Sequence, residues 1–280
     1  MGKIFSFVVI LFCLYPGSQV VQAQSLQIAS YNIRYDNPGD VQNPWKERLP
    51  VIVKLIKFHD FDIFGSQEGL HHQLDDLARG LGAYAYTGVG RDDGKEAGEF
   101  SAIFYKNDKF TLLQNGNFWL STDTSKPNKG WDAALPRICS WGQFQVKDSG
   151  FRFYFFNVHF DHKGVEARRE SSKLILEQIR KIAGSSPVIL SGDFNIDQMN
   201  ESYRILNSSK TIKSAYDQAA LVYAPNGTFN AFDINSKSDS RIDHIFLTPH
   251  FKVQKYGILT DSYQGKFPSD HFPVLVQVTY

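Results

Sequence analysis

Acids, amides and histidines stand at the ends of several apolar, strand-like runs of this sequence. Asn32 lies in "SYNIR" and Glu68 in "GSQEG", while Asp270 and His271 lie in "SDHFPV", immediately before an apolar tail. A side chain at such a place is well held for chemistry, because the last residues of a strand are rigid and face solvent. These residue types at these places indicate a catalytic or ligand-binding site.

The same pattern recurs in the middle of the chain. Four further runs contribute polar residues: Glu99 and Tyr105 in "GEFSAIFYK", Asn157, His159 and Asp161 in "NVHFDH", Asp193 and Asn195 in "SGDFN", and Asp243 in "RIDH". Taken one by one, each has an ordinary interpretation, such as a turn aspartate, a first-turn glutamate or a hydrogen-bonded histidine at the rim of the core. Burying the whole set would cost free energy unless the side chains converge on a common ligand. The conjunction therefore favours one shared site.

Apolar and alternating runs predict the strands that would position these residues. They cover residues 26–35, 61–68, 100–106, 111–121, 138–146, 151–160, 187–195, 241–248 and 272–280. Helical spacing of apolar residues recurs around residues 49–56, 74–81 and 174–182. The short polar turns "NDK" and "KDSG" predict two antiparallel hairpins. We expect a mixed α/β sandwich, formed as one domain over residues 24–280, in which strands outnumber helices.

Residues 1–23 have the features of a secretory signal peptide, with Lys3 ahead of an apolar run and a small-x-small ending at Ala23. The full chain has 30 Lys and Arg and 29 Asp and Glu, so losing Lys3 leaves 29 of each and a nearly neutral mature chain. Such a balance is not typical of a general polyanion binder. Cys139 would be the one remaining cysteine, which excludes an intramolecular disulfide. We expect a secreted or periplasmic protein without stable membrane insertion.

Read as an ordered series, these motifs resemble those of the endonuclease/exonuclease/phosphatase superfamily over nearly the whole mature chain. The series is "SYNIR", "GSQEG", "GEFSAIFYK", "NVHFDH", "SGDFN", "RIDHIF" and "SDHFPV". The segments "GRDDGKEAGEFSAIFY", "FWLS" and "ALPRICSWGQF" are most similar to exported bacterial members and, more distantly, to nocturnin-like deadenylases. Deoxyribonuclease, exonuclease III and bacterial sphingomyelinase are further branches. The resemblance implies a four-layer α/β/β/α sandwich of two mixed, largely antiparallel sheets flanked by helices, with the site where the sheet ends meet.

The resemblance also implies a divalent-metal site. By position, Glu68 would be the principal carboxylate ligand, helped by Asn32 and by Asp270. Oxygen donors of this kind suit Mg²⁺ or Mn²⁺. The sequence has no Cys/His cluster of the kind that binds structural zinc.

The resemblance assigns catalytic roles to most of the remaining positions. His271 would donate to a phosphoryl oxygen or manage the proton of the nucleophile, and Asp243 would fix its tautomer. Asp193 would orient or deprotonate the attacking water, and Asn195 would donate to the phosphoryl oxygens. His159 would be a second catalytic histidine.

Several positions have two interpretations. Glu99 would be either the carboxylate partner of His159 or a structural residue at a strand start. Arg34 and Arg137 would bind a substrate phosphate, although Arg137 fits an ordinary ion pair equally well. Tyr105 fits either the aromatic core or the site. Supporting roles around the pocket are considered for three residues, Trp45, His162 and Asn230.

Two classes of function are compatible with this sequence. The first is an exported, Mg²⁺- or Mn²⁺-dependent phosphoesterase that hydrolyses a phosphodiester or phosphomonoester by in-line attack of water, with a nuclease acting on DNA or RNA as the alternative. The second is a catalytically silent binding module, against which the presence of Glu68, Asp193, Asp243 and His271 argues. The partner would be a phosphate ester, whether a small molecule, a lipid headgroup or a nucleic acid, and we expect a monomer.

Overall fold

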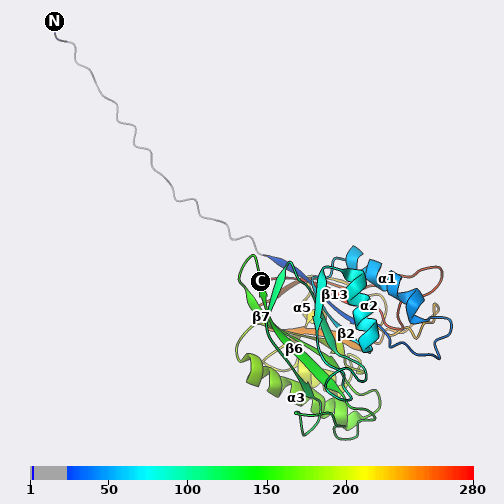
Figure 1. Ribbon diagram of the computed structural model, residues 1–280. Coiled ribbons are helices and arrows are strands. Elements are labelled where there is room, and N and C mark those ends of the chain that lie inside the picture. The colour runs from blue at the N-terminus through cyan, green and yellow to red at the C-terminus, as the bar shows by residue number, and fades with distance from the viewer. Residues whose placement is uncertain (1, 3–23) are drawn as a thin grey trace.

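The computed structural model describes Gly2 and residues 24–280. The expected signal peptide at residues 1–23 therefore lies outside the described residues, except for Gly2. Two β-sheets pack face to face, and helices cover their outer faces (Figure 1). The helices α1 (Trp45–Phe58) and α2 (His71–Leu81) lie on one outer side, and α3 (Val165–Ala183) lies on the other. This arrangement confirms the predicted four-layer sandwich.

The first sheet contains seven strands and has β1 near its centre. In spatial order these strands are β10 (Leu221–Tyr223), β12 (Lys252–Ile258), β13 (Val274–Thr279), β1 (Ser25–Asn32), β2 (Ile63–Gln67), β4 (Ala102–Lys106) and β3 (Tyr84–Thr87). β1 pairs with β13 antiparallel and with β2 parallel. Because β1 and β2 run in the same direction, Asn32 and Gln67 lie opposite each other at their carboxyl ends.

The second sheet contains six strands and is likewise mixed. In spatial order they are β5 (Phe110–Trp119), β6 (Ile138–Val146), β7 (Arg152–His159), β8 (Val188–Asp193), β11 (Asp243–Leu247) and β9 (Lys213–Ser214). The pair β7–β8 is parallel, whereas the neighbouring pairs β6–β7 and β8–β11 are antiparallel. The parallel pair brings the carboxyl ends of β7 and β8 to one edge of the sheet.

Five helices accompany the sheets in the described residues, and the three longest of them are amphipathic. The helices are α1 (Trp45–Phe58), α2 (His71–Leu81), α3 (Val165–Ala183), α4 (Glu201–Asn207) and α5 (Ala215–Gln218). In α2 the buried residues Leu74, Leu77 and Leu81 follow helical spacing, as the sequence predicts. None of the helices in residues 24–280 combines the length and apolar character that a membrane crossing requires.

Three apolar layers hold the sandwich together. The central layer lies between the sheets and includes Ile28, Phe144 and Val276. The layer under α1 and α2 includes Phe64, and the layer under α3 includes Phe156. Burying side chains of this size contributes about 2 kcal/mol or more each, so these layers supply the rigidity that the strand ends need.

One of the two predicted hairpins is correct and the other is wrong. The turn "KDSG" joins β6 to β7, which pair antiparallel. The turn "NDK" joins β4 to β5, but β4 pairs within the seven-stranded sheet and β5 within the six-stranded sheet. This turn therefore connects the two sheets. Its backbone bonds to both sides, because Asn107 N donates to Ala83 O and Lys147 N donates to Lys109 O.

Candidate active site

Three neighbouring strands of the six-stranded sheet bring two acids and a histidine into one row. His159 lies opposite Asp193 in the pairing of β7 with β8, and Asp193 lies opposite Asp243 in the pairing of β8 with β11. All three side chains are buried. Strand register alone therefore assembles residues that are far apart in the sequence.

The seven-stranded sheet contributes polar residues at the same place. Asn32 ends β1, Glu68 directly follows β2, and Asp270 precedes β13. The φ angles of Glu68, Arg34 and Asn195 are 66°, 57° and 49°, in the left-handed region that residues other than glycine rarely adopt. At all three positions the chain turns just after a strand, and such unusual backbone conformations are concentrated at functional sites.

These strand ends surround a pocket of about 460 Å³. Residues from both sheets and from the loops between strands line it: Arg34, Tyr35, Glu68, Glu99, Leu135, Arg137, His159, His162, Asp193, Asn195, Phe229, Ile242, Asp270 and His271. Its floor is rich in ionisable groups, and Leu135, Phe229 and Ile242 add apolar surface. The volume suits a small organic ligand.

The amide of Asn32 links the two halves of the site. Its Nδ2 atom lies 3.0 Å from Glu68 Oε1 and 3.0 Å from Asp193 Oδ2. Its Oδ1 atom accepts a hydrogen bond from the backbone N–H of Arg34 at 3.0 Å. Asn32 thus fixes one carboxylate from each sheet, and in this arrangement its oxygen faces the backbone rather than the two acids.

His271 is held by a carboxylate partner. Its Nδ1 atom lies 2.9 Å from Asp243 Oδ2, and its Nε2 atom lies 3.8 Å from Asp193 Oδ2. Burial alone would lower the pKa of His271, but the carboxylates of Asp243 and Asp193 outweigh it and hold the pKa well above its usual value. Burial, reinforced by the charge of Asp243, raises the pKa of Asp193 to about 7. His271 is therefore a cation beside an acid that titrates near neutrality.

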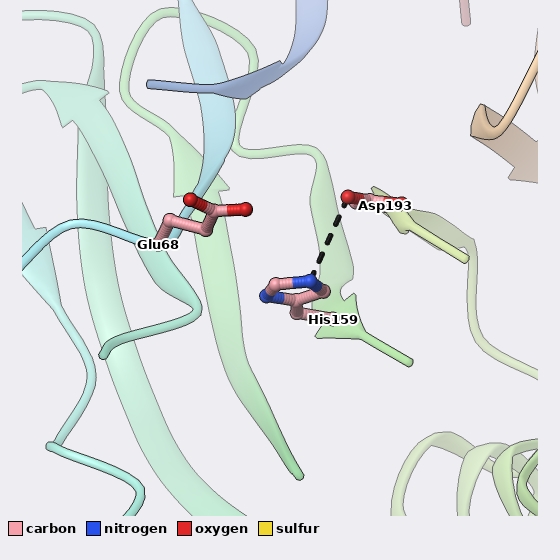
Figure 2. A group of neighbouring side chains, drawn as sticks. All are labelled: Glu68, His159 and Asp193. Atoms are coloured by element: carbon pink, nitrogen blue, oxygen red, sulfur yellow. Dashed lines mark ion pairs between the residues drawn. The ribbon is translucent and has the colours of Figure 1, made fainter. Parts of the chain in front are cut away.

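The surroundings of His159 shift its pKa in the opposite direction. Its Nε2 atom lies 3.6 Å from Asp193 Oδ2 and its Nδ1 atom 3.6 Å from Glu99 Oε2. Figure 2 shows Glu68 and Asp193 on two sides of its imidazole ring. Burial, helped by the positive charge of Arg137, holds the pKa of His159 well below its usual value. His159 and His271 therefore differ in protonation, which is the condition for separate acid and base roles.

Glu99 is fixed by an arginine that the sequence analysis did not single out. Arg91 Nη1 and Nη2 donate to its two carboxylate oxygens at 2.6 and 2.7 Å. Burial raises the pKa of Glu99 to about 7 despite the opposing charge of Arg91. This two-pronged contact fixes the orientation of the carboxylate that faces His159.

Two further arginines place positive charge at the pocket. Arg34 forms an ion pair with Asp40. The Nε atom of Arg137 lies 3.4 Å from Asp161 Oδ2. Arg137 Nη2 also lies 3.0 Å from His162 Nδ1, while its Nη1 atom has no hydrogen-bond partner among the residues that the structure describes. Asp161 therefore orients Arg137, and the arginine retains an unused donor.

The donors at the pocket floor fit a divalent cation. Oxygen or nitrogen atoms of Glu68, His159 and Asp193 lie within 4.8 Å of one another. Asp243 also has a buried carboxylate oxygen, Oδ1, that has no hydrogen-bond partner within residues 24–280. Clustered acids of this kind are stabilised by a bound cation, and their oxygens suit Mg²⁺ or Mn²⁺.

The structure places other predicted residues away from the pocket. Tyr105 lies in the core between the sheets and packs edge-on against Phe144, so we assign it no role in the site. Asn157 is also buried between the sheets, where its Nδ2 donates to Ser66 O and Ala102 O.

Two of the three proposed supporting residues lie outside the pocket lining. Trp45 Nε1 donates to Asp76 Oδ2. Asn230 supports the segment before β13 through hydrogen bonds from its N and Nδ2 to Asp270 O and Ser269 O. His162 is the one of the three that lines the pocket.

Arg48 is a second important residue that sequence reasoning missed. This fully buried side chain of α1 donates to the backbone oxygens of Ile33, Arg34, Asn43 and Pro268. It thereby fastens the segment after β1 to the segment before β13. No sequence pattern indicates this buried role, because an arginine in a helix is ordinarily a surface residue.

Replacing Arg48 with methionine should lower the free energy of unfolding by about 3 kcal/mol or more, because several buried carbonyls lose their donor at once. Chemical denaturation measures the effect. The exposed Arg152, which contacts Gln145, provides the control, and Arg152→Met should change stability by no more than about 0.5 kcal/mol. A loss below about 1 kcal/mol for Arg48→Met would contradict the assigned role.

Residues 29–271 match the model of the endonuclease/exonuclease/phosphatase family. An endonuclease/exonuclease/phosphatase family protein from Bacteroides thetaiotaomicron is 50% identical, with a TM-score of 0.91 over 92% of this chain and 99% of that one. A mannosyl-6-phosphatase from the same species is also 50% identical, with a TM-score of 0.89 over 91% of this chain and 100% of that one.

More distant similarity extends to nocturnin. Human nocturnin is 24% identical over 264 residues, which cover 84% of this chain and 58% of nocturnin. The chain thus spans little more than half the length of that relative. The catalytic domain of human nocturnin, at 21% identity and a TM-score of 0.71, shares the fold.

Proposed function

The chain belongs to the endonuclease/exonuclease/phosphatase family, and from that premise we propose that it is an exported, divalent-metal-dependent phosphoesterase acting on a small phosphate ester. Members of this family are hydrolases of phosphate esters. The observation that carries the proposal is the convergence in one pocket of Glu68, Asp193 and two histidines of opposite protonation.

The acidic cluster would hold Mg²⁺ or Mn²⁺ through Glu68, with Asp270 and Asn32 close by. When bound, such an ion supplies positive charge to the phosphoryl oxygens and polarises the ester. Arg34 and Arg137 add positive charge from the pocket wall, and both guanidiniums suit phosphate oxygens geometrically.

Hydrolysis then requires a nucleophilic water and a donor to the phosphoryl group. Asp193 is the group we assign to orient the water and take its proton, because a base that titrates near pH 7 is efficient at neutral pH. His271, with Nδ1 held by Asp243, is left with Nε2–H to donate to a phosphoryl oxygen. His159 is neutral and accepts or relays a proton beside Glu99, and Asn195 offers its second amide N–H.

Three observations support a small phosphate ester as substrate. The pocket has a volume suited to a small molecule, and the mature chain would be nearly neutral. A protein that is 50% identical over almost the whole fold is a mannosyl-6-phosphatase. We therefore propose a sugar phosphate monoester as the first substrate to test, with a nuclease activity as the alternative.

Export forms part of the same proposal. Residues 1–23 would be removed as a signal peptide, which leaves residues 24–280 as the catalytic domain in the periplasm or outside the cell.

The test is an activity screen of purified residues 24–280 with Mg²⁺ or Mn²⁺. Hexose 6-phosphates, inositol phosphates, phospholipids, small phosphodiesters, and single-stranded and duplex nucleic acids are compared by phosphate release or product chromatography. We expect the highest kcat/KM with a sugar phosphate and no turnover by Asp193→Asn. A preference for nucleic acid by tenfold or more would replace this substrate with the nuclease alternative.

A further inference from the structure

Arg34 carries a guanidinium that is fixed in place on one side. Its Nε atom lies 2.8 Å from Asp40 Oδ2 and its Nη2 atom 3.3 Å from Asp40 Oδ1. The same guanidinium lies over the ring of Tyr35, 4.6 Å from the ring centre. A bidentate carboxylate contact of this kind fixes both the position and the orientation of the side chain.

The backbone of Arg34 is held as firmly as its side chain. Its N–H donates to Asn32 Oδ1, and its carbonyl oxygen accepts from Arg48 Nη2 and from Gln73 Nε2, each at 3.0 Å. All these partners are buried. The buried network therefore fixes the backbone from which the guanidinium of Arg34 extends, and Asp40 holds the guanidinium itself.

The remaining nitrogen of this guanidinium faces two acids at the pocket floor. Nη1 lies 3.8 Å from Glu68 Oε2 and 3.7 Å from Asp270 Oδ2. These distances are too long for good hydrogen bonds but short enough for strong charge–charge interaction, because both acids are largely shielded from water. The same two acids belong to the group proposed above to attract a divalent cation.

We propose that Arg34 is a fixed counter-charge that weakens divalent-metal binding until a phosphate group neutralises it. The inference rests on the proposed metal-dependent function. A permanent positive charge near Glu68 and Asp270 repels an incoming divalent cation. An anion bound to the guanidinium cancels that repulsion, so metal and phosphate bind cooperatively, each raising the affinity of the other by the same factor.

This role differs from simple phosphate binding by Arg34. An arginine that only bound phosphate would leave metal affinity unchanged when no phosphate is present. A fixed counter-charge predicts a different result. Removing it should tighten metal binding in the absence of any anion. The two roles are therefore separated by a binding measurement that involves no catalysis.

The test measures Mn²⁺ affinity by isothermal titration calorimetry, without substrate and in a buffer free of phosphate and sulfate. Arg34→Gln should bind Mn²⁺ about tenfold more tightly than the wild type, within the usual range of coupling between sites. Arg34→Lys keeps the charge and should stay within about threefold of the wild type. Arg152→Gln, which removes an exposed arginine outside the pocket, is the matched control and should leave the affinity unchanged.

Sulfate provides the second arm as an unreactive phosphate analogue. Adding it should tighten Mn²⁺ binding by about fivefold or more in the wild type and by a smaller factor in Arg34→Gln. Arg34→Met repeats both arms with an apolar side chain of similar length, and circular dichroism checks that each variant is folded.

The outcomes separate this inference from the proposed function. If the wild type binds no Mn²⁺, both fail. If it binds Mn²⁺ but Arg34→Gln and Arg34→Met bind it equally or more weakly, the counter-charge role alone is overturned and metal dependence stands.

Discussion

Replacing His271 with alanine should lower kcat by about two to three orders of magnitude while the protein stays folded. The expected loss follows from the position of this imidazole between Asp243 and Asp193, whose carboxylates hold it as a cation at neutral pH. Removing a positioned acid or charge stabiliser ordinarily costs 10²-fold to 10⁴-fold, roughly, in rate. The measurement is kcat on the substrate that the activity screen identifies.

Three further variants test whether the loss of turnover is specific to the histidines of the pocket and the carboxylate that orients His271. His159→Ala should also lower kcat by about two orders of magnitude, because the neutral histidine serves a separate step. Asp243→Asn should lower kcat without a comparable rise in KM, since it acts by orienting His271. His250, whose ring contacts Thr248 and does not line the pocket, supplies the control, and His250→Ala should keep wild-type turnover. Wild-type turnover by His271→Ala would remove the histidine from the mechanism.

Complete loss of activity should follow removal of divalent ions. EDTA should abolish turnover, and added Mg²⁺ or Mn²⁺ should restore it, because the arginines and His271 alone do not balance the acids of the pocket and the incoming phosphate. Glu68→Gln should raise the dissociation constant for Mn²⁺ by about tenfold or more, since it removes a carboxylate charge but keeps the shape of the side chain. Calorimetry and metal-titrated activity measure the two effects.

An acid outside the pocket separates this effect from a general loss of charge. Glu96 is exposed near His71, and Glu96→Gln should leave the affinity for Mn²⁺ unchanged. Its melting temperature and that of Glu68→Gln should stay near the wild type. Full turnover in EDTA by protein shown to be metal-free would exclude the metal from the reaction.

Much of the architecture could be predicted from the sequence, because most of its strands carry strong local patterns. Residues 138–146 alternate clearly and form β6 with the predicted bounds. Four shorter or more exposed strands, β3, β9, β10 and β12, escaped prediction. β10 has only three residues, all exposed, so no buried face marks it in the sequence.

Short stretches of the sequence indicate where a turn lies, but they do not indicate which strand each strand pairs with. "NDK" has the length of a hairpin turn, yet β4 and β5 enter different sheets. Which sheet a strand joins depends on long-range packing, as with Phe110 of β5, which packs against Phe144 and Phe153. Short-range turn chemistry carries no information about that choice.

Some residues of the candidate site could likewise be predicted from the sequence, and others could not. Acids at strand ends, such as Glu68 and Asp193, stand out because they follow an apolar, strand-like run. Arg48 and Arg91 do not stand out, because each lies among other charged residues in the sequence and becomes buried only in the folded chain. Tyr105 alternates with its neighbours in β4, and only the sheet pairing reveals that its side faces the core.

The left-handed backbone of Arg34 and Glu68 has a practical consequence for protein engineering. Each residue holds a conformation that disfavours a side chain by about 1–2 kcal/mol, a penalty that glycine would relieve. A library selected for heat resistance alone would therefore be enriched in glycine at positions 34 and 68. Those variants would lose the fixed guanidinium and the central carboxylate of the pocket. Laboratory evolution of this chain for durability must therefore score turnover in every round, because changes that relieve this backbone strain also remove its chemistry.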